Sequence, residues 1–304
     1  MVVAAGGVDA PLKDHIFDPG SNLSDSDSVD AFNRRFLRKL MKNLRGIYII
    51  WYRDVLRFWR DRLRIVGALA LPLLFLVVFG AGLTKWMSLG EGISFSKFMF
   101  PGIIGMTVLM SAFMVGVSVV WDREFGFLKE VLVSPVNRAA VAIGKTLGGA
   151  TIAAIQGMLI LILSPVIGIS LSPVMVLKLL PLILLVACAL ASMGIVIASR
   201  IKSMEAFQVV MNMLMMPMVF LSGVFFPVSD LPEWMNILVK INPATYGIDP
   251  IRRVFLESMV TDETSSFTLT LFGHPMSIAE DLLIVAGFGL LMILLAMWSL
   301  SISD

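Results

Sequence analysis

Charged side chains are missing from six long apolar stretches of this sequence, although they are common between those stretches. The stretches are Ile65–Thr84, Phe98–Trp121, Thr146–Leu177 (broken near Ser164-Pro165), Leu179–Ser199, Ala206–Ser229 and Leu282–Ser303. A hydrocarbon core of about 30 Å takes about 20 helical residues to cross, with each backbone amide bonded inside its own helix. The six stretches therefore predict an all-α integral membrane protein with six transmembrane helices. We place these spans at about 65–84, 98–121, 146–168, 177–199, 206–226 and 282–302.

Cysteine and histidine are also scarce. The chain contains one cysteine, Cys188, and two histidines, His15 and His274, which we expect on opposite sides of the membrane. A single cysteine forms neither an intramolecular disulfide nor a cysteine-based metal site. No set of nucleophile, base or metal ligands accompanies the acidic residues between the spans. We therefore expect no enzyme activity, no metal and no cofactor bound by this chain.

The lack of ionisable residues inside the stretches bears on the energy source of any transport. Carriers driven by an ion gradient generally place Asp, Glu, Lys, Arg or His at mid-membrane, where these residues mark the ion pathway. None of the six stretches contains such a residue. This absence argues against an ion-coupled secondary transporter, which stays open as an alternative together with a membrane scaffold subunit without transport activity.

An ATP-binding loop is missing as well. The loop needs G-x-x-x-x-G-K-[ST], whose backbone amides cradle phosphates. Gly144-Lys145-Thr146 has the required ending, but position 139 is alanine and the triplet opens a predicted span. We expect Lys145 to extend toward the membrane interface, and Gly144 and Gly148 to permit close helix packing. A transporter built from this chain would take its energy from a partner.

Positive charge is distributed unevenly between the segments. Of the 24 Lys and Arg residues, eighteen lie before the first span, after the second or after the fourth, and six lie on the other side. Positive residues favour the cytoplasmic side of a membrane. We therefore expect both termini in the cytoplasm.

The segment before the first span has two parts. Residues 1–32 are rich in Ser, Asp and Gly, and we predict a disordered cytoplasmic tail over 1–43. From about Arg45 to Arg64 the apolar residues fall on one helical face and the arginines on the other, which predicts an amphipathic interfacial helix. Its marker residues are Trp51, Arg53, Arg57, Trp59 and Arg60. The helix serves either as a lipid anchor or also as a contact for a cytoplasmic partner.

The segment between the second and third spans mixes acids, bases and apolar residues. Leu128, Val131 and Leu132 share one face of a predicted short helix, which Pro135 ends. Below a membrane domain, the apolar face of such a helix has little lipid to pack against. A protein partner would supply the missing contact. The alternative is a compact loop that merely joins the two spans.

The apolar run of the fifth span is interrupted before it has left the membrane. Gly223 and Pro227 break the pattern, and non-helical backbone at this depth is tolerated only when it is buried in protein or lines a cavity. We therefore predict short external or re-entrant helices between spans five and six, followed by an external loop over residues 261–281. Trp234 and Tyr246 are expected at headgroup level, and Pro250 leaves the end of one helix undefined.

Polar and methionine side chains inside the spans offer a candidate substrate path. Gln156 and Asn212 either join helices or contact substrate. Met213 and Met216 belong to a methionine-rich stretch that either packs the core or forms an adaptable lining for an amphiphile.

Three motifs between the spans carry a resemblance. They are Asp122-Arg-Glu-x-Gly126 with Leu132-x-Ser-Pro135, Arg138 and Gly144-Lys145; Leu221-Ser-Gly-x-Phe-Phe-Pro227; and Asn242-Pro-x-Thr-Tyr246-x-x-Asp249-x-x-Arg252. In their order and spacing, over about residues 44–302, the chain resembles permeases of ATP-binding-cassette (ABC) transporters of the type-2 exporter class. That class includes drug-resistance, nodulation-factor and polysaccharide export permeases.

The resemblance implies a function and partners. The chain would be the permease subunit of an ATP-driven exporter in a prokaryotic inner membrane, moving an amphiphilic drug, lipid or lipid-linked glycan. Two copies of a separate ATPase subunit would hold the ATP and Mg, and a second permease half would complete a homodimer or heterodimer. Membrane lipid is an expected partner and nucleic acid is not.

The resemblance also implies two groups of site residues. The segment that couples to the ATPase would contain Asp122, Glu124, Gly126, Leu128, Glu130, Leu132, Ser134 and Pro135. The external re-entrant segment would contain Gly223, Phe226, Pro227, Asn242, Pro243, Tyr246, Asp249 and Arg252.

Overall fold

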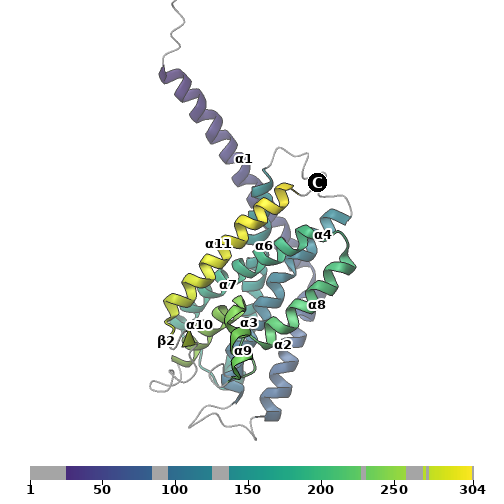
Figure 1. The fold of residues 1–304 in the computed structure, drawn as a ribbon, viewed down its shortest axis with the longest axis vertical. Coiled ribbons are helices and arrows are strands. Elements are labelled where there is room, and N and C mark those ends of the chain that lie inside the picture. The colour runs from purple at the N-terminus through teal and green to yellow at the C-terminus, as the bar shows by residue number, and fades with distance from the viewer. Residues whose placement is uncertain are drawn as a thin grey trace, which may run out of the picture. The chain divides into compact units, whose positions relative to one another are not determined.

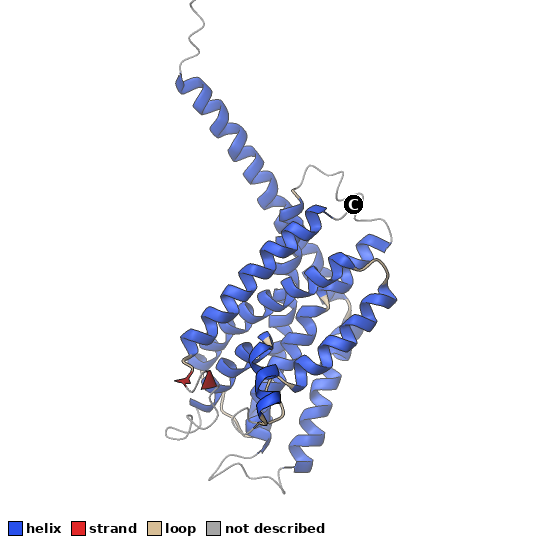
Figure 2. Cartoon of the chain, in the orientation of Figure 1, coloured by secondary structure: helices blue, strands red, loops and turns tan. Residues whose placement is uncertain are grey.

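The computed structural model describes residues 25–83, 95–124, 137–226, 231–257, 270–271 and 274–302, and it is almost entirely helical (Figure 2). The helices are α1 (Asp25–Arg60), α2 (Arg62–Leu83), α3 (Phe95–Phe113), α4 (Val115–Glu124), α6 (Arg138–Ile162), α7 (Pro173–Arg200), α8 (Met204–Phe220), α9 (Glu233–Ile241), α10 (Pro243–Glu257) and α11 (Ile278–Ile302). A 3₁₀ turn, η1, covers Ser164–Ile167, and a small antiparallel pair joins β1 (Thr270–Leu271) to β2 (His274–Pro275).

Five helical segments among the described residues are long and apolar enough to cross a membrane. They are Arg62–Phe79, Phe95–Glu124, Arg138–Ile162, Pro173–Arg200 and Ile278–Ser301. The prediction of a helical multi-pass membrane protein is therefore confirmed. α8 occupies the predicted fifth span but has 17 residues, about 26 Å at 1.5 Å per residue. It ends at Phe220 because the chain turns there and Gly223 adopts a positive φ of 77°.

Several element boundaries differ from the sequence prediction. α1 begins at Asp25, inside the segment 1–43 that we predicted to be disordered. Met114 forms a turn that divides the second span into α3 and α4. α10 continues through Pro250 to Glu257, which defines the boundary that this proline had left open. The break predicted near Ser164-Pro165 is confirmed by η1, which Gly168 ends in the left-handed region.

The chain divides into two compact units, Met1–Lys42 and Asn43–Asp304. In the second unit, α3, α6, α7 and α11 pack side by side, and α10 packs against α3, α7 and α11 (Figure 1). The α10 residues from Ala244 to Leu256 are all buried. α10 is thus enclosed by protein, as the prediction of a re-entrant helix requires of backbone at membrane depth.

Two glycines of α3 allow α10 and the turn after α8 to approach closely. A Cβ atom on Gly105 would lie 2.3 Å from Ile248 Cγ1, and one on Gly102 would lie 2.7 Å from the backbone oxygen of Val224. By contrast, only 6% of the α2 residues from Arg62 to Phe79 are buried, so this helix presents an apolar surface to its surroundings.

The contact at Gly102 predicts a sharp difference between two glycine substitutions. Gly102→Ala should lower the free energy of unfolding by about 1–3 kcal/mol, because its methyl group meets backbone that cannot rotate away. Gly287→Ala, where nothing lies within 4 Å of the added Cβ, should be neutral or slightly stabilising because alanine favours helix. Thermal unfolding of the purified variants in detergent measures both. Equal stability of the two variants would contradict the close approach.

Candidate functional site

The end of α4 carries three consecutive charged residues, and each binds a different part of the bundle. The Asp122 carboxylate lies 2.6 Å from Lys145 Nζ of α6 and 3.7 Å from an Arg53 nitrogen of α1. Arg123 donates to the Ser199 carbonyl at the end of α7, at 2.8 Å. Glu124 accepts from the Met204 backbone amide at the start of α8, at 3.3 Å. This end of α4 therefore joins four helices.

Lys145 is the buried member of this cluster. Its side chain is 2% exposed, and it also donates to the Ser118 hydroxyl at 3.0 Å. The prediction that Lys145 extends toward the interface is wrong, because Asp122 lies one helix away and neutralises it inside the protein. Residue spacing in the sequence does not predict this ion pair, since the two residues belong to different helices. Asp122 thus holds the end of α4 against α6 and α1.

α1 packs on α6 where α6 has small residues. A Cβ atom on Gly144 would lie 3.0 Å from Ile50 Cβ, and one on Gly148 would lie 3.2 Å from Asp54 Cβ. Trp51 Nε1 donates to the Thr151 hydroxyl at 3.0 Å. The predicted role of the two glycines in close helix packing is confirmed, because larger side chains would separate the two helices.

The five marker residues of the amino-terminal helix divide into two groups. Trp51 and Arg53 contact α6 and Asp122, and the Arg57 guanidinium lies 5.8 Å from the centre of the Trp121 ring. Trp59 and Arg60 are exposed. One side of α1 is therefore docked on the bundle, and the other remains available to lipid or a partner.

Six of the predicted coupling residues lie outside the described residues: Gly126, Leu128, Glu130, Leu132, Ser134 and Pro135. The two residues that follow this gap also contact the bundle. The Asn137 amide donates to Asn43 Oδ1 at 3.4 Å, and Arg138 donates to the Ser301 carbonyl of α11 at 2.5 Å. Both ends of the predicted coupling segment are thus attached to the helix bundle.

The re-entrant segment contains a second buried charge cluster. Arg253 pairs with Asp249 one turn earlier and with Asp281 of α11, the latter at 3.2 Å. The Arg252 guanidinium donates to the Gly223 carbonyl and lies 4.4 Å from the centre of the Phe98 ring. These contacts join α10 to α3, to α11 and to the turn after α8. We had assigned Asp281 to an external loop, but it lies in the first turn of α11 and is fully buried.

Other predicted residues of this segment hold the turn between α9 and α10. Asn242 Nδ2 donates to the Met218 carbonyl at 2.8 Å, and Pro243 begins α10, where its missing amide hydrogen leaves no bond unmade. The Tyr246 side chain is buried and donates to the Lys240 carbonyl at 2.7 Å. Protein therefore covers Tyr246, whereas Trp234 is 62% exposed. Phe226 is half-buried and Pro227 lies outside the described residues.

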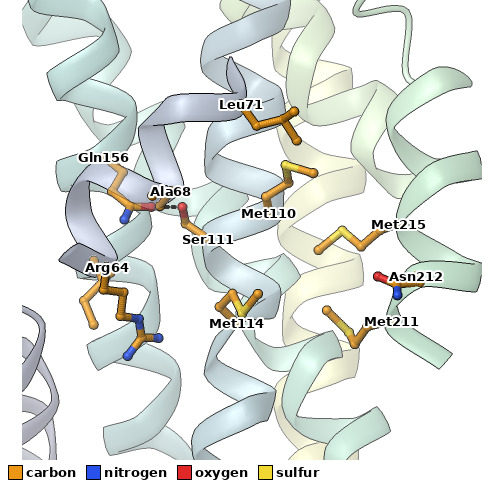
Figure 3. A pocket seen from close by; sticks show the side chains of 12 residues that line it. Arg64, Ala68, Leu71, Met110, Ser111, Met114, Gln156, Met211, Asn212 and Met215 are labelled. Atoms are coloured by element: carbon orange, nitrogen blue, oxygen red, sulfur yellow. Dashed lines mark hydrogen bonds between the residues drawn. The ribbon is translucent and has the colours of Figure 1, made fainter. Parts of the chain in front are cut away.

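A cavity of about 440 Å³ lies between α2, α3, α6 and α8 (Figure 3). Methionines surround it, and Gln156 and Asn212 reach it from opposite sides. Gln156 is buried and accepts a hydrogen bond from Ser111, so it joins α6 to α3 as well as lining the space. A second cavity of about 220 Å³ shares Asn212 and includes Met216. Met213 lines neither cavity and is 77% exposed.

The buried Asp122–Lys145 pair predicts a large coupling between the two side chains. Lys145→Met should lower the free energy of unfolding by about 3 kcal/mol, because it leaves a largely buried carboxylate with only the more distant Arg53. Adding Asp122→Leu should recover most of this loss, since an apolar pair of similar volume is close to neutral. A double-mutant cycle from thermal unfolding in detergent measures the coupling.

The matched control is Lys178→Met, which breaks an exposed ion pair with Glu257 and should cost at most about 1 kcal/mol. If the Lys145→Met and Asp122→Leu losses simply add, the pair does not hold α4 to α6.

This chain is similar to a known protein family and to several known permeases. The family model of the ABC-2 type transporter matches residues 45–256, which run from α1 to α10. The transport permease ycf38 of Cyanophora paradoxa is 26% identical over 278 residues, covering 90% of this chain and 92% of that protein. Nodulation protein J of Rhizobium leguminosarum bv. viciae is 28% identical over 210 residues, 68% of this chain and 81% of that one.

A third relative is named as the multidrug ABC transporter permease YbhR of Escherichia coli strain K12. It is 27% identical over 171 residues, 56% of this chain and 46% of that one. Because the family model covers more than half of the chain, this chain belongs to the ABC-2 transporter family of membrane permeases.

Proposed function

We propose that this chain is the permease subunit of an ATP-driven exporter and that the segment 125–136 couples it to a separate ATPase. The observation that carries the proposal is the attachment of both ends of this segment. Asp122, Arg123 and Glu124 bind α1, α6, α7 and α8 on one side, and Asn137 and Arg138 bind α1 and α11 on the other. A force on the segment would therefore reach most of the bundle.

The coupling step is a shift between two states of the permease. Nucleotide binding or release on the ATPase changes the permease only if the ATPase contacts differ between those states. An apolar face formed by Leu128, Val131 and Leu132, with Glu124 and Glu130 beside it, is the proposed contact. ATP and Mg belong to the ATPase subunits, of which the complex has two. The exposed side of α1, with Trp59 and Arg60, lies in the membrane interface and meets lipid or the same subunit.

The proposed substrate is amphiphilic and enters the cavity of Figure 3. Its volume of about 440 Å³ is in the range of about 300–1,000 Å³ that small-molecule sites occupy. Methionine side chains adapt to varied apolar shapes, while Gln156 and Asn212 offer hydrogen bonds to a polar group. The name of one relative, a multidrug ABC transporter permease, supports a drug as substrate, and a lipid or lipid-linked glycan is proposed beside it.

The functional unit is proposed to be a dimer of two permease halves, identical or different, in a prokaryotic inner membrane. Exposed apolar residues of α2 and α8, such as Leu74, Val77 and Met213, provide a face for the second half next to the cavity. α8 is proposed to complete six crossings, so that both termini lie in the cytoplasm. Export then moves the substrate from the cytoplasm or inner leaflet to the outside.

Association with the ATPase should depend on the apolar face of the coupling segment. Leu128→Asp should abolish co-purification of the ATPase with the tagged permease, because an ionised carboxylate does not enter an apolar groove without a large desolvation penalty. Leu128→Met at the same position is the matched control and should keep the complex. Quantitative pull-down from detergent-solubilised membranes measures both. Unchanged association of Leu128→Asp would disprove the coupling assignment while leaving the fold unaffected.

The orientation can be tested by cysteine labelling in a Cys188→Ala background. Glu233→Cys, on exposed α9, should react with a membrane-impermeant maleimide in intact cells. Asn137→Cys, at the exposed start of α6, should react only after the membrane is permeabilised. The opposite pattern would invert the proposed orientation, and labelling of both in intact cells would rule out a membrane between them.

A further inference from the structure

A second hollow lies on a different face of the bundle, between α7, α10 and α11. Its volume is about 870 Å³, and it shares no residue and no helix with the cavity of Figure 3. Its lining is apolar except for Lys178 and Glu257; the other lining residues are Pro181, Leu182, Leu185, Val254, Ile278, Ala279, Leu282, Leu283 and Ala286.

Residue spacing makes this hollow a groove along the helices. Lys178, Leu182 and Leu185 fall on one face of α7, and Ile278, Leu282 and Ala286 fall on one face of α11. Small side chains at Ala279 and Ala286 leave room between the two walls. From Lys178 to Leu185 the groove follows α7 for about 10 Å, which is most of the hydrocarbon depth of one leaflet, about 15 Å.

The mouth of the groove carries one charge of each sign. Lys178 Nζ lies 3.3 Å from a Glu257 carboxylate oxygen, and the two side chains are 56% and 50% exposed. Lys178 lies near the start of α7, and Glu257 ends α10. An exposed pair of this kind is held weakly, so its two charges can accept other partners of opposite sign.

We propose that this groove binds one phospholipid with a zwitterionic aminophosphate headgroup, such as phosphatidylethanolamine. The lipid phosphate pairs with Lys178, the lipid ammonium pairs with Glu257, and one acyl chain lies between α7 and α11. Charge complementarity selects this occupant: an anionic lipid would satisfy Lys178 but place its negative charge beside Glu257. The bound lipid would cover Val254 of α10, the helix that carries the Asp249–Arg253 cluster.

Native mass spectrometry of the delipidated full-length protein tests the proposal. Phosphatidylethanolamine and phosphatidylglycerol are added at equal concentrations, and bound lipid is counted. Phosphatidylethanolamine should bind about tenfold more tightly, because only its headgroup makes both charge-assisted contacts. Lys178→Ala should remove this preference, and the exchanged pair Lys178→Glu with Glu257→Lys should restore it.

Two further variants separate the groove from other lipid contacts. Ala286→Trp should fill the groove and abolish tight lipid binding, and Ala279→Phe provides a second filling variant at an exposed position. Lys240→Ala removes a lysine of α9 that lies outside the groove, and it should leave binding unchanged. Equal binding of the two lipids by the unaltered protein would overturn the proposal, and so would tight binding that persists in both filled variants. A disulfide between the Leu283→Cys residues of two chains, formed without bound lipid, would also overturn it, because a second copy of the chain would then cover the groove.

Discussion

The structure depends on how charge is placed where water is scarce. An isolated ion costs several kcal/mol in such surroundings, so a buried charge needs a partner close by. Lys145 and Asp122, 2.6 Å apart, meet this condition across two helices, and Arg53 brings a third helix to the same point. Once this pair has formed, the end of α4 has one position relative to α6. Arg123 and Glu124 then stand beside the end of α7 and the start of α8.

The same constraint acts on α10. This helix is buried over most of its length and carries Asp249, Arg252 and Arg253, which would be unstable there without partners. Asp281 supplies the opposite charge from α11, while the Gly223 carbonyl and the Phe98 ring receive Arg252. The two clusters lie far apart along the bundle: α4 and the end of α11 are at one end, and α10 is near the other (Figure 1). Each one fixes a helix that does not itself cross the whole membrane.

Much of this fold follows from hydrophobicity alone. The apolar runs predicted the five described helical segments that are long enough to cross a membrane, the Ser164-Pro165 break and the packing at Gly144 and Gly148. These features depend on residue types close together in the chain. The pairs Asp122–Lys145 and Arg253–Asp281 depend on which helices become neighbours, and no single-sequence pattern encodes that. For this reason Lys145 was predicted to reach the interface and Asp281 to lie in a loop. Residues 1–43 were predicted to be disordered from composition, and composition did not reveal the helix that begins at Asp25.

The division of the second span at Met114 links the two ends of the proposed mechanism. Met114 lines the cavity between α2, α3, α6 and α8, and it also forms the turn between α3 and α4. From Val115 to Glu124, α4 extends about 15 Å, and its far end holds the residues that lead into the coupling segment. α3 is buried almost throughout, so it resists displacement, and we propose that the backbone angles change at the turn formed by Met114. In the proposed mechanism a push on residues 125–136 would therefore move α4 about Met114 and alter the wall of the cavity. A continuous helix from Phe95 to Glu124 would instead carry the motion into the buried core, where close packing opposes it.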